Sequence, residues 1–206
     1  MKKIVIGALL SLTAAYAFAA SDVPPDALAR SVTDEVLAIV RADKDLQGGN
    51  PQKVAQLVEA KVLPHFNFER MTQLAVGRNW RQANAEQQKA LIDEFRMLLV
   101  RTYTAAFSQY RNQSVDYRPL HMAAGDTDVV VKSLIKQPSG QPVGIDYSME
   151  KLGTAWKVYD VKIEGISLVE NYRNTFNSEI QKSGVDGLIK VLSDKNKALA
   201  AQAARR

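Results

Sequence analysis

A change of hydrophobic period across Gly165 constrains this chain more than any other feature. Apolar residues follow a strand-like pattern before the glycine and recur at helical spacing after it: Trp156, Val158, Val161 and Ile163, then Val169, Tyr172, Phe176 and Ile180. Ser167 and Glu170 have the spacing of a capping box, in which two side chains satisfy the first free amides of a helix. The stretch therefore predicts a strand that passes directly into a helix.

The N-terminus has the pattern of an export signal. Lys2 and Lys3 precede an apolar run over residues 4–15, and Ala17-Phe18-Ala19 is a cleavage signal of the A-x-A type. We expect residues 1–19 to be a signal peptide and residues 20–206 to form a single exported domain. No later apolar run reaches the roughly 20 residues of a membrane-spanning helix. Disulfides and thiolate metal sites are excluded, because the chain has no cysteine.

The first half of the domain reads as helices. One apolar stripe from Leu28 to Val40 predicts a helix that ends before Gly48-Gly49, and Asn50-Pro51 starts a second. A third, short helix is predicted after Phe66-Asn67-Phe68 and ends at Gly77. The longest helix begins at Asn84, with Gln87 three residues later, and keeps its period to about Tyr110.

The second half begins as a sheet and ends in helices. From Val115 the period becomes two, and turn signals at Gly125-Asp126, 138–140 and Gly153 divide about four antiparallel strands. The last strand changes parity, which predicts a bulge near Tyr159-Asp160. After Gly165 a helix follows, and Ser183-Gly184 separates it from a final amphipathic helix. This order predicts one α+β domain.

Catalytic chemistry is not indicated. His65 and His121 are the two histidines, and neither has a serine or carboxylate at a recognisable motif spacing. Asp146 and Asp160 could act as a carboxylate pair only if both faced one cavity. Strand alternation sends Asp146 outward, so we interpret Asp160 as structural. The formal net charge is +5, with cations and anions interspersed, which argues against nucleic-acid binding. We expect no enzyme activity, no metal and no cofactor.

The run from Trp156 to Phe176, with Asn171-Tyr172-Arg173 after the capping box, resembles the signature of the MlaC family of periplasmic phospholipid-binding proteins, also called toluene-tolerance auxiliary proteins. A second segment, residues 66–71 followed by 75–80, is similar to the family's F-D-F and L-G-x-x-W segments. Asn67 and Val76 depart from the commoner Asp and Leu, and Asn67 can cap a helix equally well.

The resemblance implies a curved antiparallel sheet wrapped by N-terminal and C-terminal helices. This is a cystatin-like or nuclear-transport-factor-like cone with a deep apolar cavity. It implies a carrier that buries both acyl chains of a glycerophospholipid as cargo and maintains outer-membrane lipid asymmetry. The implied partners are an outer-membrane lipoprotein complex and an inner-membrane ABC transporter with an MCE-domain subunit. We expect a monomer.

The periodicity supplies candidates for the cavity wall, to which the resemblance gives a lipid-binding role. The predicted lipid-binding residues are Phe68, Met71, Leu74, Leu98, Leu99, Tyr103, Phe107, Tyr110, Val129, Val131, Ile145, Tyr147, Trp156, Val158, Ile163, Val169 and Tyr172. Composition alone leaves open that all of them are ordinary core, since 46% hydrophobic residues is typical of globular proteins.

Two alternatives from other functional classes stay open at this point. An enzyme of the same cone, acting on a small apolar substrate, requires a buried carboxylate at the cavity floor. A protein-interaction module or chaperone requires a filled core and an exposed apolar groove. The headgroup, acyl-chain length, transport direction and docking surfaces are not encoded in any pattern that we recognise.

Overall fold

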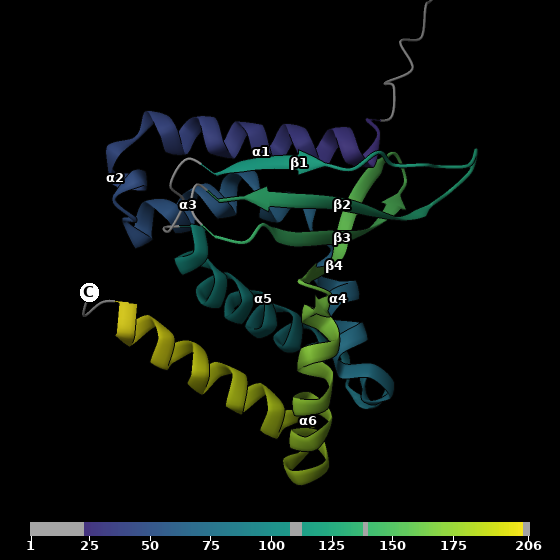
Figure 1. The fold of residues 1–206 in the computed structure, drawn as a ribbon. Coiled ribbons are helices and arrows are strands. Elements are labelled where there is room, and N and C mark those ends of the chain that lie inside the picture. The colour runs from purple at the N-terminus through teal and green to yellow at the C-terminus, as the bar shows by residue number, and fades with distance from the viewer. Residues whose placement is uncertain (1–22, 108–112, 138–139, 204–206) are drawn as a thin grey trace, which may run out of the picture.

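The computed structural model describes residues 23–107, 113–137 and 140–203 (Figure 1). The helices are α1 (Pro25–Ala42), α2 (Lys44–Gln47), α3 (Pro51–Lys61), η1 (Leu63–His65), α4 (Phe68–Val76), η2 (Gly77–Gln82), α5 (Ala85–Phe107) and α6 (Leu168–Ala203). The strands are β1 (Ser114–Tyr117), β2 (Asp128–Lys136), β3 (Val143–Leu152), β4 (Ala155–Ile163) and β5 (Ile166–Ser167). The predicted α+β class, with a curved antiparallel sheet between helical segments, is confirmed. Within these residues no helix is both long and apolar enough to cross a membrane.

The predicted helix starts are made by side-chain caps. Asn50 accepts hydrogen bonds from the backbone N–H groups of the first turn of α3, and Asn67 accepts from the backbone of Arg70 at 3.0 Å. Asn84 and Gln87 form the predicted reciprocal capping box, at 2.9 and 3.0 Å. Each cap satisfies backbone donors that have no partner inside the helix.

The first helix ends earlier than its apolar stripe predicts. Asp43 has an extended backbone, and its carboxylate accepts from the N–H groups of Asp45 and Leu46 at 2.8 and 3.2 Å. It therefore ends α1 at Ala42 and caps the short α2. The prediction of one helix up to Gly48 is wrong because a capping aspartate lies inside an otherwise helical pattern.

The sheet has five strands in the order β1-β2-β3-β4-β5, with every pair antiparallel. The short β5, which pairs with the end of β4, is an addition to the four predicted strands. Ser148 pairs with Asp160, whereas the next residue, Met149, pairs with Val158. Tyr159 is thus the extra residue of a bulge, which confirms the predicted irregularity and explains the change of parity along β4.

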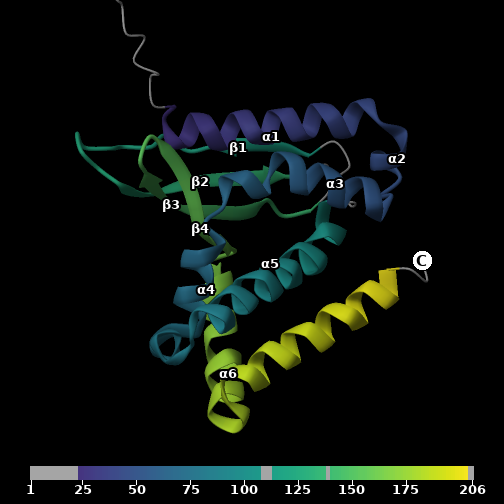
Figure 2. The same ribbon diagram turned by 180° about the vertical axis from the view of Figure 1, so that it is seen from behind.

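The last helix is bent at the predicted break. Gly184 has φ 72° and ψ −176°, a conformation open to glycine but unfavourable for other residues. The two halves of α6 meet there at a sharp elbow, and the second half runs beside α5 (Figures 1 and 2). Asn196 anchors it by donating to the backbone oxygen of Glu94 at 2.9 Å.

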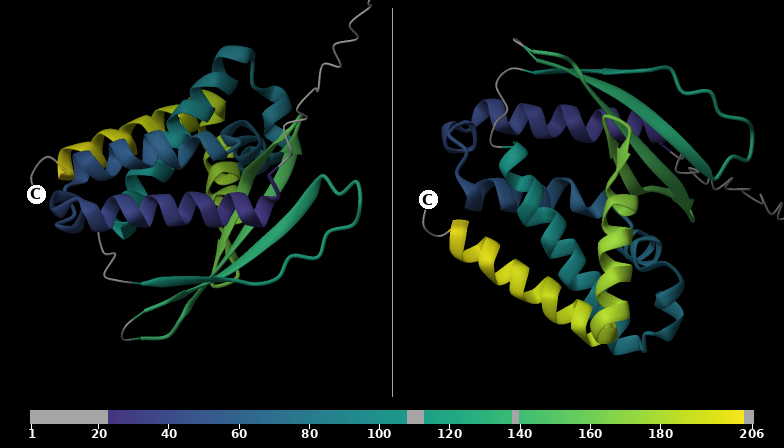
Figure 3. Two further views of the ribbon diagram at one scale, coloured as in Figure 1. Left: turned by 90° about the horizontal axis from the view of Figure 1, so that it is seen from above. Right: turned by 60° about the horizontal axis from the view of Figure 1, so that its bottom comes forward.

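Buried apolar side chains form three clusters. The helical cluster lies among α4, α5 and α6, the N-terminal cluster among α1, α2 and α3, and the sheet cluster on one face of the sheet. Phe66 is partly buried and packs against the helical and the sheet clusters. Phe68 is also partly buried and packs against the helical and the N-terminal clusters. Figure 3 shows that α1 and α3 lie on the same side of the sheet, which we call its inner face.

Polar contacts join α4 to the opposite, outer face of the sheet. The Arg70 guanidinium forms ion pairs with Glu150 on β3 and with Asp128 on β2, and lies 3.7 Å from the ring centroid of Tyr159. Tyr159 donates to Asp128 at 2.8 Å, and the Asn67 amide donates to Glu150 at 2.8 Å. The bulge in β4 therefore places Tyr159 within this network, which we call the Arg70 clamp.

Candidate functional site

The strand register divides the inner face of the sheet into four cross-strand rows. From the β3–β4 hairpin toward the opposite end, the rows are Val129, Met149 and Val158; Val131, Tyr147 and Val161; Tyr117, Ser133, Ile145, Ile163 and Ile166; and Val115, Ile135 and Val143. Apart from the hydroxyls of Tyr117, Ser133 and Tyr147, these side chains are hydrocarbon or thioether. The face is therefore apolar across all the strands.

Burial decreases along these rows although their apolar character does not. The three residues of the first row are buried, whereas all three of the fourth row are only partly buried. Ile166, at the β5 end of the third row, is 64% exposed. An apolar face that the rest of the protein covers incompletely is typical of a surface that binds an apolar partner.

The Tyr117 hydroxyl joins the inner face of the sheet to α1. Tyr117 donates to the backbone oxygen of Ala29 at 3.0 Å and shares a 2.6 Å hydrogen bond with Thr33, so it ties β1 to α1. Burial raises the pKa of the Tyr117 phenol, and the hydrogen bond with Thr33 opposes that rise. This tie fixes α1 as a cover over the sheet.

Ser133 and Tyr147 carry the other two hydroxyl groups of the inner face. Ser133 is buried and donates to the backbone oxygen of Ile145 at 3.1 Å. Burial raises the pKa of the Tyr147 phenol to about 12, and the nearby Ser133 hydroxyl opposes that rise. Tyr147 is therefore a neutral hydrogen-bond donor over the whole physiological pH range.

A second apolar wall lies on the helical cluster. Tyr103 on α5 and Tyr172 on α6 are partly buried against it, and the Tyr172 ring meets the edge of Phe95 at 5.1 Å between centroids. Burial raises the pKa of both phenols, and the proximity of Tyr172 adds to the rise at Tyr103. Like the sheet, this wall combines buried hydrocarbon with a few neutral hydroxyls.

The predicted lipid-binding residues divide between the two walls. Met71, Leu98, Leu99 and Val169 are buried in the helical cluster, with Phe68, Leu74, Tyr103 and Tyr172 partly buried beside it. Val129, Val131, Trp156 and Val158 are buried in the sheet cluster, with Ile145, Tyr147 and Ile163 partly buried. The side chain of Phe107 and the whole of Tyr110 lie outside the described residues.

Sequence reasoning missed part of the inner face. Val115, Ile135 and Val143 of the fourth row, together with Tyr117 and Ile166, were not among the predicted lipid-binding residues. The alternation in β3 and the short apolar runs in β1 and β2 contain a signal for the fourth row. Tyr117 and Ile166 depend on strand pairing, which the sequence does not specify directly.

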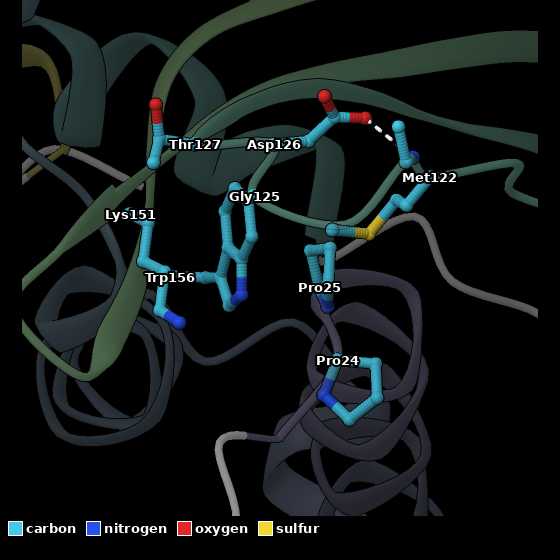
Figure 4. Close-up of a pocket in the computed structure, with 9 residues that line it drawn as sticks. Pro24, Pro25, Met122, Gly125, Asp126, Thr127, Lys151 and Trp156 are labelled. Atoms are coloured by element: carbon cyan, nitrogen blue, oxygen red, sulfur yellow. Dashed lines mark hydrogen bonds between the residues drawn. The ribbon is translucent and has the colours of Figure 1, made fainter.

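A pocket of about 330 Å³ lies at the other end of the sheet (Figure 4). It opens between the start of α1, the β1–β2 loop and the β3–β4 hairpin. Pro24, Pro25, Met122 and Trp156 give it apolar walls, and Asp126 and Lys151 add charges. Its residues, apart from Trp156, are not among those predicted to bind lipid.

The groups considered for catalysis have structural surroundings. The buried carboxylate of Asp160 accepts from the backbone N–H of Val169 at 3.1 Å and so caps α6, which agrees with the structural role predicted for it. His121 is exposed, and burial lowers the pKa of His65, aided by Lys157 and opposed by Glu35. In the described part of the chain, no three side chains of histidine, aspartate or glutamate gather where they could hold a metal ion.

The family can now be assigned from comparison with known proteins. The model of the family described as MlaC protein matches residues 30–194. This chain belongs to the MlaC family. The β4–α6 junction lies within the matched residues, and Arg173 in it donates to the backbone oxygen of Leu74 at 2.9 Å, joining α6 to α4.

Individual MlaC relatives agree with this assignment. The chain is 23% identical over 174 residues to the intermembrane phospholipid transport system binding protein MlaC of Haemophilus influenzae, covering 83% of this chain and 81% of that protein. It is 25% identical over 181 residues to the toluene tolerance protein ttg2D of Pseudomonas putida, covering 86% and 83%. A solved phospholipid-binding protein from Ralstonia solanacearum, in complex with a phospholipid, is 48% identical, with a TM-score of 0.79 over 85% of this chain and 98% of that one.

Proposed function

We propose that this protein is a periplasmic carrier that encloses both acyl chains of a glycerophospholipid between the sheet and the helical cluster. The observation that carries the proposal is the inner face, which stays apolar over four rows while its cover decreases. The Ralstonia solanacearum relative, 48% identical, was solved with a phospholipid bound. The residues predicted to bind lipid remain our proposal for the two walls.

The dimensions of the inner face suit an acyl chain. Successive rows are two residues apart along a strand, so four rows span about 20 Å. One lipid tail occupies half of a bilayer's hydrocarbon core, about 15 Å. We place the opening at the fourth row, where Val115, Ile135 and Val143 are only partly buried.

The energetics require a carrier of this kind. Two tails with roughly 30 methylenes lose on the order of 25 kcal/mol on leaving an apolar environment for water. A protein that supplies an apolar seat removes most of this cost. Because a bilayer offers the tails a similar environment, transfer is close to balanced, and docking partners set its direction.

The remaining parts of the proposal follow from this role. Residues 1–19 act as a cleaved signal peptide, and residues 20–206 work in the periplasm as a monomer. The carrier exchanges lipid with an outer-membrane lipoprotein complex and with an inner-membrane ABC transporter that has an MCE-domain subunit. It binds and releases its cargo without chemical change and without a cofactor, and so maintains the lipid asymmetry of the outer membrane.

Native mass spectrometry of protein purified from the bacterial periplasm tests the proposal. We expect a mass increase that corresponds to one glycerophospholipid per chain, and intact phospholipid after gentle extraction. Protein that carries no lipid, and takes none up from phospholipid vesicles, contradicts the carrier role. Release of cleaved fatty acids from those vesicles supports an enzyme instead.

A further inference from the structure

We propose that the Tyr147 hydroxyl is the donor that binds an ester carbonyl of the cargo, so that the protein prefers ester-linked to ether-linked phospholipids. The inference rests on the proposed function and adds a chemical specificity to it. It follows from accounting for the hydroxyl protons on the inner face of the sheet.

The proton of Tyr117 is already committed to the protein. Its hydroxyl donates to the backbone oxygen of Ala29 at 3.0 Å, so Thr33 is the donor in the 2.6 Å hydrogen bond that they share. Turning the Tyr117 proton toward a ligand leaves a carbonyl oxygen of α1 without this donor and breaks the tie between α1 and β1. A buried carbonyl oxygen that loses its donor destabilises the fold.

The proton of Ser133 is committed in the same way. It is donated to the backbone oxygen of Ile145 at 3.1 Å. Among the described residues, no hydrogen bond takes up the proton of the Tyr147 hydroxyl, which is buried in the apolar face. Tyr147 can therefore donate to a ligand without breaking a hydrogen bond within the protein.

The position of Tyr147 matches the depth of an ester group. Tyr147 is in the second row, between Val131 and Val161, and its hydroxyl lies near Ser133 in the third row. The third row lies one step, about 7 Å, inside the fourth row, where we place the opening. A lipid whose phosphate stays at the opening brings its ester carbonyls to this level, whereas its tails continue past it.

Ether-linked lipids isolate this interaction from tail burial. A diether phospholipid with the same headgroup and chain length has the same hydrocarbon but lacks both carbonyl oxygens. A neutral hydrogen bond contributes about 0.5–1.5 kcal/mol. The expected preference for the diester form is therefore about 2- to 13-fold.

The experiment is a competition on the intact mature protein. Delipidated protein is incubated with vesicles that contain equal amounts of diester and diether phosphatidylcholine, and bound lipid is measured by mass spectrometry. Wild-type protein should be enriched in the diester, and Tyr147→Phe should lower the ratio to about one while it still carries lipid. Tyr159→Phe, which removes a hydroxyl from the outer face, should keep the wild-type ratio.

Ser133→Ala provides a second test in which the Tyr147 hydroxyl remains. The Ser133 proton is used within the sheet, so this variant should keep the diester preference of the wild type. Equal binding of the two lipids by wild-type protein, or a preference that survives Tyr147→Phe, overturns the inference but leaves the carrier role intact. Failure to bind either lipid overturns the proposed function itself.

Discussion

Removal of the Arg70 guanidinium tests how α4 and the sheet are held together. In Arg70→Met, the ion pairs with Glu150 and Asp128 are lost, while much of the apolar contact with the Tyr159 ring is kept. The side chain of Glu150 is 12% exposed, that of Arg70 31% and that of Asp128 49%. The clamp therefore lies between a surface pair and a buried one.

The expected magnitude follows from these exposures. An exposed ion pair contributes about 0–1 kcal/mol, whereas breaking a buried pair costs about 3–5 kcal/mol. We expect Arg70→Met to lower the free energy of unfolding by about 2–3 kcal/mol, mainly because Glu150 loses its charged partner. Urea denaturation, followed by far-UV circular dichroism, measures this difference.

A double-mutant cycle with Glu150→Gln assigns the loss to the pair. The glutamine keeps an acceptor for Asn67 but removes the charge, and we expect a coupling free energy of about 1–2 kcal/mol with Arg70. Lys190→Met is the matched control, since it removes an exposed intrahelical pair with Asp194 and should cost less than about 0.5 kcal/mol. If Arg70→Met costs no more than this control, the clamp does not hold α4 to the sheet.

Three other predictions concern the cavity wall, the titration of Tyr147 and the elbow in α6. Ile145→Glu buries an unpaired charge on the inner face and should abolish retention of phospholipid, measured by lipid extraction. Lys132→Glu, on the exposed outer face, should keep the phospholipid. Equal retention by both variants contradicts the assignment of the wall. The folded-state pKa of Tyr147 is raised from 10.0 to about 12, so the neutral phenol stabilises the fold fully below pH 10, and this stabilisation is lost as the pH rises through 12. Tyr147→Phe should therefore weaken the pH dependence of the free energy of unfolding between pH 10 and 12. An unchanged pH profile argues against burial of Tyr147. Gly184→Ala forces a non-glycine residue into φ 72° and should lower the free energy of unfolding by about 1–2 kcal/mol, and a neutral result in urea denaturation means that the elbow relaxes without cost.

The sequence predicts the parts of this fold that depend on local chemistry. Caps at Asn50, Asn67 and Asn84, the break at Gly184 and the bulge at Tyr159 all arise from side chains or parity within a few residues. These features are therefore confirmed almost position by position. The one helix boundary that is wrong also has a local cause, the cap that Asp43 forms.

The candidate site is less predictable because it depends on which apolar residues share a wall. Periodicity identifies Leu98 and Val131 as inward-facing, but it does not reveal that one belongs to the helical cluster and the other to the sheet cluster. Strand register adds Ile166 to the same row as Ile145, although the two are far apart in the chain. The hydrogen bonds that occupy the protons of Tyr117 and Ser133, and so distinguish Tyr147, require coordinates.

The division into separate apolar clusters has a consequence for how the protein unfolds. Among the described residues, Phe66 and Phe68 are the side chains that pack against two clusters, so without cargo each cluster can melt with some independence. A lipid held between two of them supplies the contacts of a shared core. The loaded protein should therefore lose its structure in one sharp transition, and the empty one over a broader range of temperature.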